Sequence, residues 1–279
     1  MPRLRIGQVD YINCLPVYHA LEEGMLVENL ELVKGTPASL NKMFLDGDLD
    51  ITPISSIEYA RHNKRCAILP NLSISADGKV GSILFFSRSP VTELEGRNVS
   101  VTMSSATSVA LLRILFEHYY HVQAELRPAP PDLDAMLDSA DGALLIGDDA
   151  MLAHHKVQRE NSDLTVTDLG EAWKKFTGEK MVYAVWVIQS NLAAKHPDTV
   201  ERLRRLFLES RAMGLANRET LVQKAHRRSQ LPRDLISNYL QTIHHDLGED
   251  ERRALLLFFD YAYKTGIIDE RVKLKVWGD

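Results

Sequence analysis

The stretch RIGQVDYINCLPVYHALEEG, residues 5–24, contains the pattern that decides the fold. Apolar and polar side chains alternate at its start, which predicts a strand over residues 3–9. The polar residues Tyr11 and Asn13 follow, and residues 15–24 are typical of a helix with a proline in its first turn and a glycine at its end. A strand that continues into a helix through a polar turn predicts an α/β fold, in which ligands bind beyond the carboxyl ends of the strands.

Strands and helices alternate along most of the remaining chain. Further strands are expected at residues 30–37, 50–54, 81–90, 97–103, 124–128, 142–147 and 181–189. Helices are expected at residues 36–50, 55–63 and 104–120, and almost throughout from about residue 192 onward. This order predicts a mostly parallel α/β protein that ends in a helical tail.

The order of the segments favours two α/β lobes with a cleft between them. We expect lobe 1 to comprise residues 1–90 together with 190–279, and lobe 2 to comprise residues 91–189. Under this interpretation the chain crosses between the lobes twice, at FFSRSP (85–90) and VWVIQS (185–190). A doubly wound single domain is the alternative.

Composition excludes several classes of protein. The chain has 279 residues, of which 45% are hydrophobic and 25% are charged, as is usual for a soluble globular protein. A formal net charge of −5 gives no basic surface for nucleic acid, and no apolar stretch is long enough for a membrane span. The two cysteines, Cys14 and Cys66, lack the spacing of a metal site, and no secretory leader is recognisable. We expect a cytoplasmic protein without disulfides, metal or cofactor.

A cluster of hydroxyl side chains precedes the helix at 104–120. Ser104, Ser105, Thr107 and Ser108 stand where free backbone N–H groups and the helix dipole favour an anion. A single hydroxyl is enough for an ordinary N-cap, so capping remains the second interpretation. We favour a carboxylate ligand, because the chain has none of the glycine-rich sequences that bind nucleotide phosphates.

Other polar residues near predicted strand ends carry less information. Asn13 is typical of a turn, Ser56 of a helix cap, and the pair Asp148–Asp149 of a helix start. The chain lacks a nucleophile-elbow sequence and an HExxH sequence, so no familiar hydrolase or metal centre is predicted. The residues alone predict a two-lobed α/β protein with an oxygen-rich cleft for a small carboxylate.

Six blocks in order resemble the chorismate dehydratase family of the futalosine route to menaquinone. The blocks are RIGQVDYINCLPVYHAL, GDLDITPISSIEYAR, LPNLSISADGKVGSILFFSR, VSVTMSSATSVALLRIL, GALLIGDDAML and DLGEAWKKFTGEKMVYAVW. This resemblance covers residues 5 to about 190. It implies the type II periplasmic-binding-protein-like fold, with a cleft between two lobes. It also implies a lyase that removes water from chorismate to give 3-(1-carboxyvinyloxy)benzoate.

The resemblance also implies a set of site residues. Asn13 in YINCLP and Ser82 in VGSILFFS match catalytic-site residues of the family. Substrate-binding roles are implied for Tyr11, Ser56, Ser105, Thr107, Ser108 and Gly147. No histidine or glutamate in the matched blocks is an evident general base, so we hypothesise that the enolpyruvyl carboxylate of the substrate removes the C3 proton.

Two departures from the family pattern bear on these expectations. Glu179 and Lys180 replace an apolar–proline pair, which leaves the shape of one cleft wall open. The sister enzyme, 1,4-dihydroxy-6-naphthoate synthase, has a histidine near the fourth strand end, where this chain has LIGDDA. That difference favours the dehydratase. A non-catalytic cytoplasmic module that binds a small carboxylate, and the sister synthase, remain the alternatives, and the oligomeric state stays open.

Overall fold

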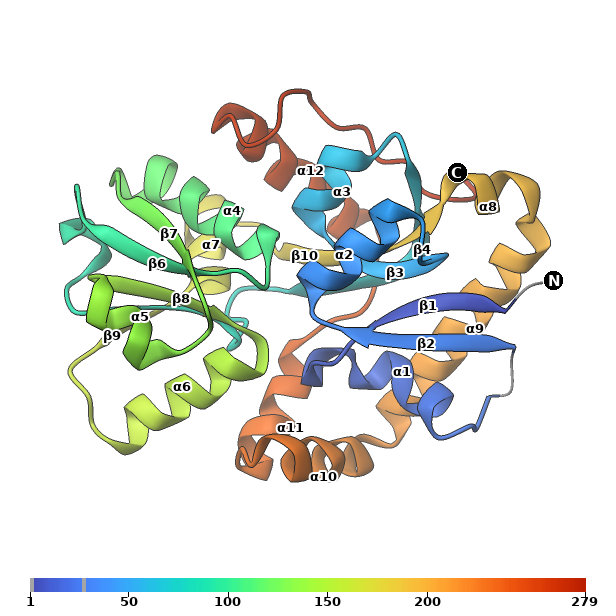
Figure 1. Cartoon of the computed structure of the whole chain (residues 1–279), viewed down its shortest axis with the longest axis horizontal. Coiled ribbons are helices and arrows are strands. Elements are labelled where there is room, and N and C mark those ends of the chain that lie inside the picture. Colours follow the sequence, from blue (N-terminus) through green and yellow to red (C-terminus); the bar gives the residue numbers. More distant parts are fainter. Residues whose placement is uncertain (1–2, 27–28) are drawn as a thin grey trace.

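Two sheets of five strands each form the framework of the computed structural model, which describes residues 3–26 and 29–279. The first sheet has the order β2 (Leu30–Gly35), β1 (Leu4–Val9), β3 (Ile51–Ser55), β10 (Met181–Gln189) and β4 (Cys66–Ala76). The second sheet has the order β7 (Glu125–Ala129), β6 (Asn98–Thr102), β8 (Gly142–Ile146), β5 (Ile83–Ser87) and β9 (Thr165–Asp168). The two sheets lie side by side, each in its own lobe, which confirms the predicted two-lobed architecture (Figure 1).

The two sheets share one plan. In the first, β1 pairs in parallel with β2 and β3, and β10 pairs antiparallel with β3 and β4. In the second, β6 pairs in parallel with β7 and β8, and β5 pairs antiparallel with β8 and β9. The carboxyl ends of the parallel strands of both sheets therefore meet at the boundary between the lobes, where a ligand site is expected.

The sheets divide the chain at other places than the predicted boundaries. β5 belongs to the second sheet and β10 to the first, so the chain crosses over residues 77–82 and 178–180 rather than over 85–90 and 185–190. Local sequence marks both segments as strands but does not say which sheet a buried strand joins. By this division lobe 1 comprises residues 3–26, 29–76 and 181–279, and lobe 2 comprises residues 83–177.

Helices cover the faces of both sheets. In lobe 1 before the first crossing they are α1 (Leu15–Glu22), α2 (Pro37–Asp46) and α3 (Ser56–His62), with a short 3-10 turn at Ile12–Cys14. In lobe 2 they are α4 (Ala106–Leu115), α5 (Leu133–Ser139), α6 (Gly147–Arg159) and α7 (Leu169–Thr177), with a 3-10 turn at Val91–Glu93 and a π-helical turn at Phe116–Tyr120. The C-terminal helices are α8 (Ser190–Lys195), α9 (Pro197–Ala216), α10 (Arg218–Ser229), α11 (Arg233–Thr242) and α12 (Glu249–Lys264).

The C-terminal helices belong to lobe 1, as expected for the helical tail. The contact between α9 and α1 is close, since a Cβ on Gly214 would lie 2.1 Å from the carbonyl oxygen of Pro16. The Ser210 hydroxyl donates to the Val17 carbonyl at 2.6 Å in the same contact. In Figure 1, α10 and α11 lie below the sheet of lobe 1, and α11 is on the side that faces lobe 2. The tail is therefore placed to reach the boundary between the lobes.

The first crossing is held to lobe 2 by one carboxylate. Asp168, at the start of α7, accepts hydrogen bonds from the N–H groups of Val80 and Gly81 in the crossing and of Gly170 and Glu171 in the helix. Burial raises the pKa of the Asp168 carboxyl, and these backbone donors oppose the rise. The crossing passes so close to Gly170 that a Cβ there would lie 2.4 Å from the Gly78 carbonyl oxygen.

The core fills the space between each sheet and its helices. Its largest fully buried side chains include Trp173 in α7 and Trp186 on β10. The Trp186 indole donates to the Tyr18 hydroxyl at 2.9 Å, and that hydroxyl donates to the Gly7 carbonyl at 2.8 Å. These contacts fasten α1 to β1 and β10 in lobe 1.

Candidate functional site

A narrow cavity of about 70 Å³ lies between the lobes at the carboxyl ends of the parallel strands. We call it the site cavity. The residues that line it are Val9, Tyr11, Asn13, Cys14, Pro37, Pro53, Ile54, Ser55, Ile74, Val80, Ser82, Ile83, Ser105, Ser108, Ile146, Gly147, Tyr183, Ala184 and Ile243. They come from both sheets and from both segments of lobe 1, so only the folded chain assembles them.

Five helices of the described chain begin at the site cavity, and two of them, α2 and α3, start at the lining residues Pro37 and Ser55. Cys14 precedes α1, Ser105 is the N-cap of α4, and Gly147 is the first residue of α6. The amino ends of helices present free N–H groups and partial positive charge. No lining side chain within residues 3–26 and 29–279 is a lysine, arginine, histidine, aspartate or glutamate. An anionic ligand in this cavity would therefore be held by helix ends and hydroxyls.

The structure brings most of the predicted site residues together and leaves two apart. Those that line the cavity are Tyr11, Asn13, Ser82, Ser105, Ser108 and Gly147. Ser56 does not, because its fully buried hydroxyl donates to the Val182 carbonyl at 2.7 Å. Thr107 does not either, since its hydroxyl accepts from the N–H of Ile57 at 3.1 Å and joins α4 to α3 across the lobes.

Asn13 and Ser82 present two different functions to the cavity. The Asn13 Oδ1 atom is buried and has no hydrogen-bond partner among the described residues. Such an atom is costly to bury unless a ligand donor reaches it. The Ser82 Oγ atom accepts a hydrogen bond from the Tyr239 hydroxyl at 2.9 Å, so its own proton remains available. The pair therefore offers an acceptor and a donor.

Tyr11 and Gly147 meet across the cleft. Gly147 has a φ of +60°, and a Cβ on it would lie 3.0–3.1 Å from three carbons of the Tyr11 ring. Both the backbone conformation and the contact therefore favour glycine. The Gly147 N–H donates to the Ser82 carbonyl at 2.7 Å, which links the start of α6 to the end of the first crossing. Burial, followed by the nearby Asp149, raises the pKa of Tyr11 to about 12, so its hydroxyl keeps its proton.

Ser105 and Ser108 combine capping with exposure to the cavity. The Ser105 hydroxyl accepts from the Ser108 N–H at 3.3 Å, which is the expected N-cap bond. The two hydroxyl oxygens are 3.1 Å apart, and either can be the donor. Because one of the two protons stays free, the cap can still donate to a ligand.

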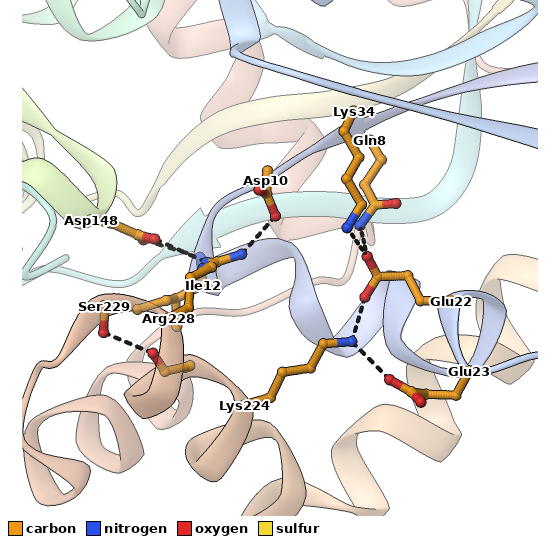
Figure 2. A network of polar contacts seen from close by, with 11 residues as sticks. Gln8, Asp10, Ile12, Glu22, Glu23, Lys34, Asp148, Lys224, Arg228 and Ser229 are labelled. Carbon is orange, nitrogen blue, oxygen red and sulfur yellow. Dashed lines mark hydrogen bonds and ion pairs between the residues drawn. The ribbon is translucent and has the colours of Figure 1, made fainter.

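A group of ion pairs joins the lobes beside the cavity. Asp148 at the start of α6 accepts from the Ile12 N–H at 3.1 Å and pairs with Arg228 of α10 at 2.9 Å. Arg228 also pairs with Asp10 at 2.6 Å, so one guanidinium connects a carboxylate from each lobe (Figure 2). Burial raises the pKa of the Asp148 carboxyl, and the Ile12 N–H and Arg228 oppose the rise. Asp148 therefore serves as a contact between the lobes.

A neighbouring network of ion pairs fastens α10 to α1 in lobe 1. Glu22 of α1 pairs with Lys224 at 2.6 Å and with Lys34 at 2.5 Å, and accepts from the Gln8 amide at 2.8 Å (Figure 2). Although burial works in the other direction, hydrogen bonds from Lys224, Lys34 and Gln8 lower the pKa of Glu22 to about 2. This network supports the helix that carries Arg228.

The two residues that depart from the family pattern point away from the cavity. Lys180 pairs with Glu251 of α12 at 2.6 Å, and Glu179 contacts Arg253 of the same helix at 3.2 Å. Neither Glu179 nor Lys180 lines the site cavity. The substitution therefore joins the second crossing to α12 and leaves the cavity wall to other residues.

Two residues beside the site are missed by sequence reasoning. Tyr239 of α11 contacts Ser82, and His245 after α11 contacts the Asn13 carbonyl at 2.8 Å. Both lie in the helical tail, more than 150 residues from their partners in the chain. The adjacent pair His244–His245 is visible in the sequence, but nothing local shows which of them faces the site.

The described part of the chain has neither a metal-binding cluster nor a membrane-spanning helix. Residues 3–26 and 29–279 contain no group of three or more His, Cys, Asp or Glu side chains placed to hold a metal ion. None of the helices in these residues combines the length and apolar character that a membrane span requires. The site cavity remains the place where chemistry is expected.

Comparisons with known proteins find relatives of this chain in sequence and in structure. A family model described as menaquinone biosynthesis matches residues 4–264. A chorismate dehydratase from Thermus thermophilus is 28% identical over 265 residues, which cover 91% of this chain and 93% of the relative. A chorismate dehydratase from Campylobacter jejuni is 30% identical over 182 residues, or 64% of each chain.

A solved structure shows the same fold in a different class of protein. The periplasmic aliphatic sulphonate binding protein SsuA from Escherichia coli has a TM-score of 0.68 at 15% identity, over 99% of this chain and 92% of that one. The expected periplasmic-binding-protein-like fold is confirmed by this likeness. At such low identity the likeness concerns the fold alone.

Proposed function

The chain belongs to the menaquinone biosynthesis family, and we propose that it is a chorismate dehydratase, a carbon–oxygen lyase. The observation that carries the proposal is the unpartnered, buried Oδ1 of Asn13 in a cavity that also presents hydroxyl donors and helix amino ends. An acceptor for a substrate hydroxyl beside donors for carboxylates suits chorismate, which has one ring hydroxyl and two carboxylates.

Substrate binding in this proposal follows the polarity of the cavity walls. The Asn13 Oδ1 accepts from the C4 hydroxyl, and Ser82 donates to one carboxylate. Ser105 and Ser108, at the start of α4, donate to the other carboxylate. Donors that are fixed before the substrate arrives stabilise the negative charge that spreads into the ring carboxylate as the C3 proton leaves.

The proposed reaction is an elimination in which the C3–H and C4–O bonds break and the ring becomes aromatic. The lining residues supply no ionised base, because burial raises the pKa of the Cys14 thiol and the pKa of Tyr11 is raised to about 12. The enolpyruvyl carboxylate of the substrate therefore takes the C3 proton. That proton and the C4 hydroxide leave as water. The protein contributes mainly orientation.

The proposal extends to the cellular setting. It places the enzyme in the cytoplasm, on the futalosine route to menaquinone, with chorismate as its small-molecule partner and without a cofactor. Fractionation of cells that express the tagged full chain would test the location, and menaquinone analysis of a deletion strain would test the route.

The decisive experiment is incubation of the purified protein with chorismate. Loss of one water, seen by mass spectrometry together with a new aromatic absorbance, is the expected result. Asn13→Val should abolish this conversion. The control Asn63→Val should not, because the Asn63 amide donates to the Ala60 carbonyl at the end of α3, outside the cavity.

The other outcomes would replace the proposal. Intact chorismate that binds tightly by calorimetry would indicate a binding module with no chemistry. Absence of both turnover and binding would refute chorismate as the ligand, and the substrate of the sister synthase would then be tested. Full activity of Asn13→Val would remove the role assigned to that amide.

A further inference from the structure

The hydroxyl group of Tyr239 lies between the two residues to which the proposed function assigns catalysis. Tyr239 is buried in α11 and does not line the site cavity. Its hydroxyl donates to Ser82 Oγ at 2.9 Å and lies beside the Asn13 side chain. One phenol therefore contacts Asn13 from lobe 1 and Ser82 from the crossing between the lobes.

The direction of these hydrogen bonds sets what each side chain shows to a ligand. A tyrosine hydroxyl has one proton, and here that proton goes to Ser82. Its oxygen can then only accept a further hydrogen bond, so the NH₂ group is the part of the Asn13 amide that can bond to it. The Asn13 Oδ1 atom has no partner among the described residues, so Tyr239 does not donate to it.

The same logic applies to the serine. Because Ser82 accepts from Tyr239, its own proton is free to point into the cavity. A carboxylate can only accept hydrogen bonds, so it needs such a donor. Were the Ser82 proton directed to the tyrosine instead, Ser82 would present only lone pairs to an anionic substrate. Donation from Tyr239 also polarises the serine hydroxyl and strengthens it as a donor.

A second contact from the same part of the chain holds the Asn13 backbone. The buried ring of His245 lies 2.8 Å from the Asn13 carbonyl through its Nε2 atom. The Ser73 N–H donates to the His245 carbonyl at 3.0 Å, which seats this segment along the edge of β4. The segment from α11 to His245 therefore holds the main chain of Asn13 and places Tyr239 beside its side chain.

We propose that Tyr239 is a positioning residue that makes Asn13 an acceptor and Ser82 a donor toward the substrate. The effect of Tyr239 on catalysis rests on the proposed function, whereas its effect on the orientation of the two side chains is independent of that function. The helical tail thereby completes a site whose other parts come from the strand ends.

The test is the variant Tyr239→Phe, which removes one oxygen and keeps the ring. We expect kcat/KM for chorismate to fall about 10–100-fold, because the two side chains are no longer held in productive orientation. The matched control is Tyr18→Phe, which removes a buried tyrosine hydroxyl in lobe 1 that bonds Trp186 and the Gly7 carbonyl. That control should lower the Tm at least as much and retain the wild-type kcat/KM.

Crystal structures of the unliganded wild type and Tyr239→Phe provide a measurement that needs no turnover. The expected result is a turned Asn13 amide, or a second Ser82 rotamer, in the variant. Unchanged positions of both side chains would overturn the proposal, as would wild-type kinetics of Tyr239→Phe or an equal kinetic loss in Tyr18→Phe. If the wild type fails to convert chorismate, the proposed function falls, and the rotamer comparison alone decides the role of Tyr239.

Discussion

The contact between Gly147 and Tyr11 is the point where a single methyl group should disturb the site most. Gly147→Ala adds a Cβ that would lie 3.0–3.1 Å from the Tyr11 ring, on a backbone with φ of +60°. The backbone conformation is unfavourable for alanine, and the ring has to move to admit the methyl group. Because Tyr11 lines the cavity beside Asn13, its displacement should reach the substrate.

The magnitude follows from two contributions. An L residue in the left-handed region costs roughly 1–2 kcal/mol. Overpacking of a close contact adds roughly 1–3 kcal/mol. With about 2 °C of Tm per kcal/mol for a chain of this size, the expected loss is roughly 4–10 °C. A ring shift of up to about 1 Å should lower kcat/KM by about 10–100-fold at a temperature where the variant is fully folded.

The matched control is Gly47→Ala at the end of α2. Gly47 has a φ of +87°, and a Cβ there would meet nothing within 4 Å, so only the backbone contribution remains. We expect a Tm loss of about 2–4 °C and unchanged kinetics from this control. Differential scanning calorimetry and steady-state kinetics on both variants decide the matter. Equal Tm losses with wild-type activity in Gly147→Ala would refute the claim that this contact shapes the site.

Three further predictions concern the surroundings of the cavity. Arg228→Met leaves Asp10 and Asp148 without their shared cation. We therefore expect KM to rise about fivefold and small-angle scattering to show a larger radius of gyration. An unchanged KM and radius would argue against this contact as one that holds the lobes together. Thr107→Val leaves the buried N–H of Ile57 unpaired, so the free energy of unfolding should fall by about 1–3 kcal/mol at an unchanged KM. A raised KM without loss of stability would restore the predicted substrate role of Thr107. Burial lowers the pKa of His245 to about 4, so only the unfolded chain takes up this proton as the pH falls from 6.5 to 4. The free energy of unfolding should therefore decline over this range with a slope that approaches about 1.4 kcal/mol per pH unit. Urea unfolding of His245→Gln should show a flatter decline, and an identical slope would contradict the assignment.

The sequence alone determined the local units and the outline of the site. The strand, polar turn and helix of residues 5–24 follow from alternation, from side chains that favour turns, and from helix-end residues. The same local rules placed the hydroxyls of residues 104–108 at the start of a helix, where Ser105 caps α4 and lines the cavity. Residues next to strand ends could be predicted as neighbours in space, because parallel strands bring their carboxyl ends to one edge.

Tertiary structure decided which sheet each central strand joins and which hydroxyls face the cavity. β5 and β10 are both buried apolar strands, and pairing partners far along the chain assign them to sheets. Thr107 and Ser108 are adjacent on one helix, but only Ser108 lines the cavity, while Thr107 bonds to α3. A side chain's face depends on how its helix is rotated against its neighbours, and local spacing leaves that rotation undefined.

The support from the helical tail was invisible for the same reason. Tyr239 and Ser82 are 157 residues apart in the chain, and His245 and Asn13 are 232 apart. Spacing shows that Tyr239 belongs to a helix, but the identity of the group opposite its hydroxyl depends on how α11 docks on lobe 1. Hydrogen bonds between distant segments are set by that docking, so the local sequence indicated most of the polar residues that line the cavity, and the assembled fold decided which residues contact them from behind.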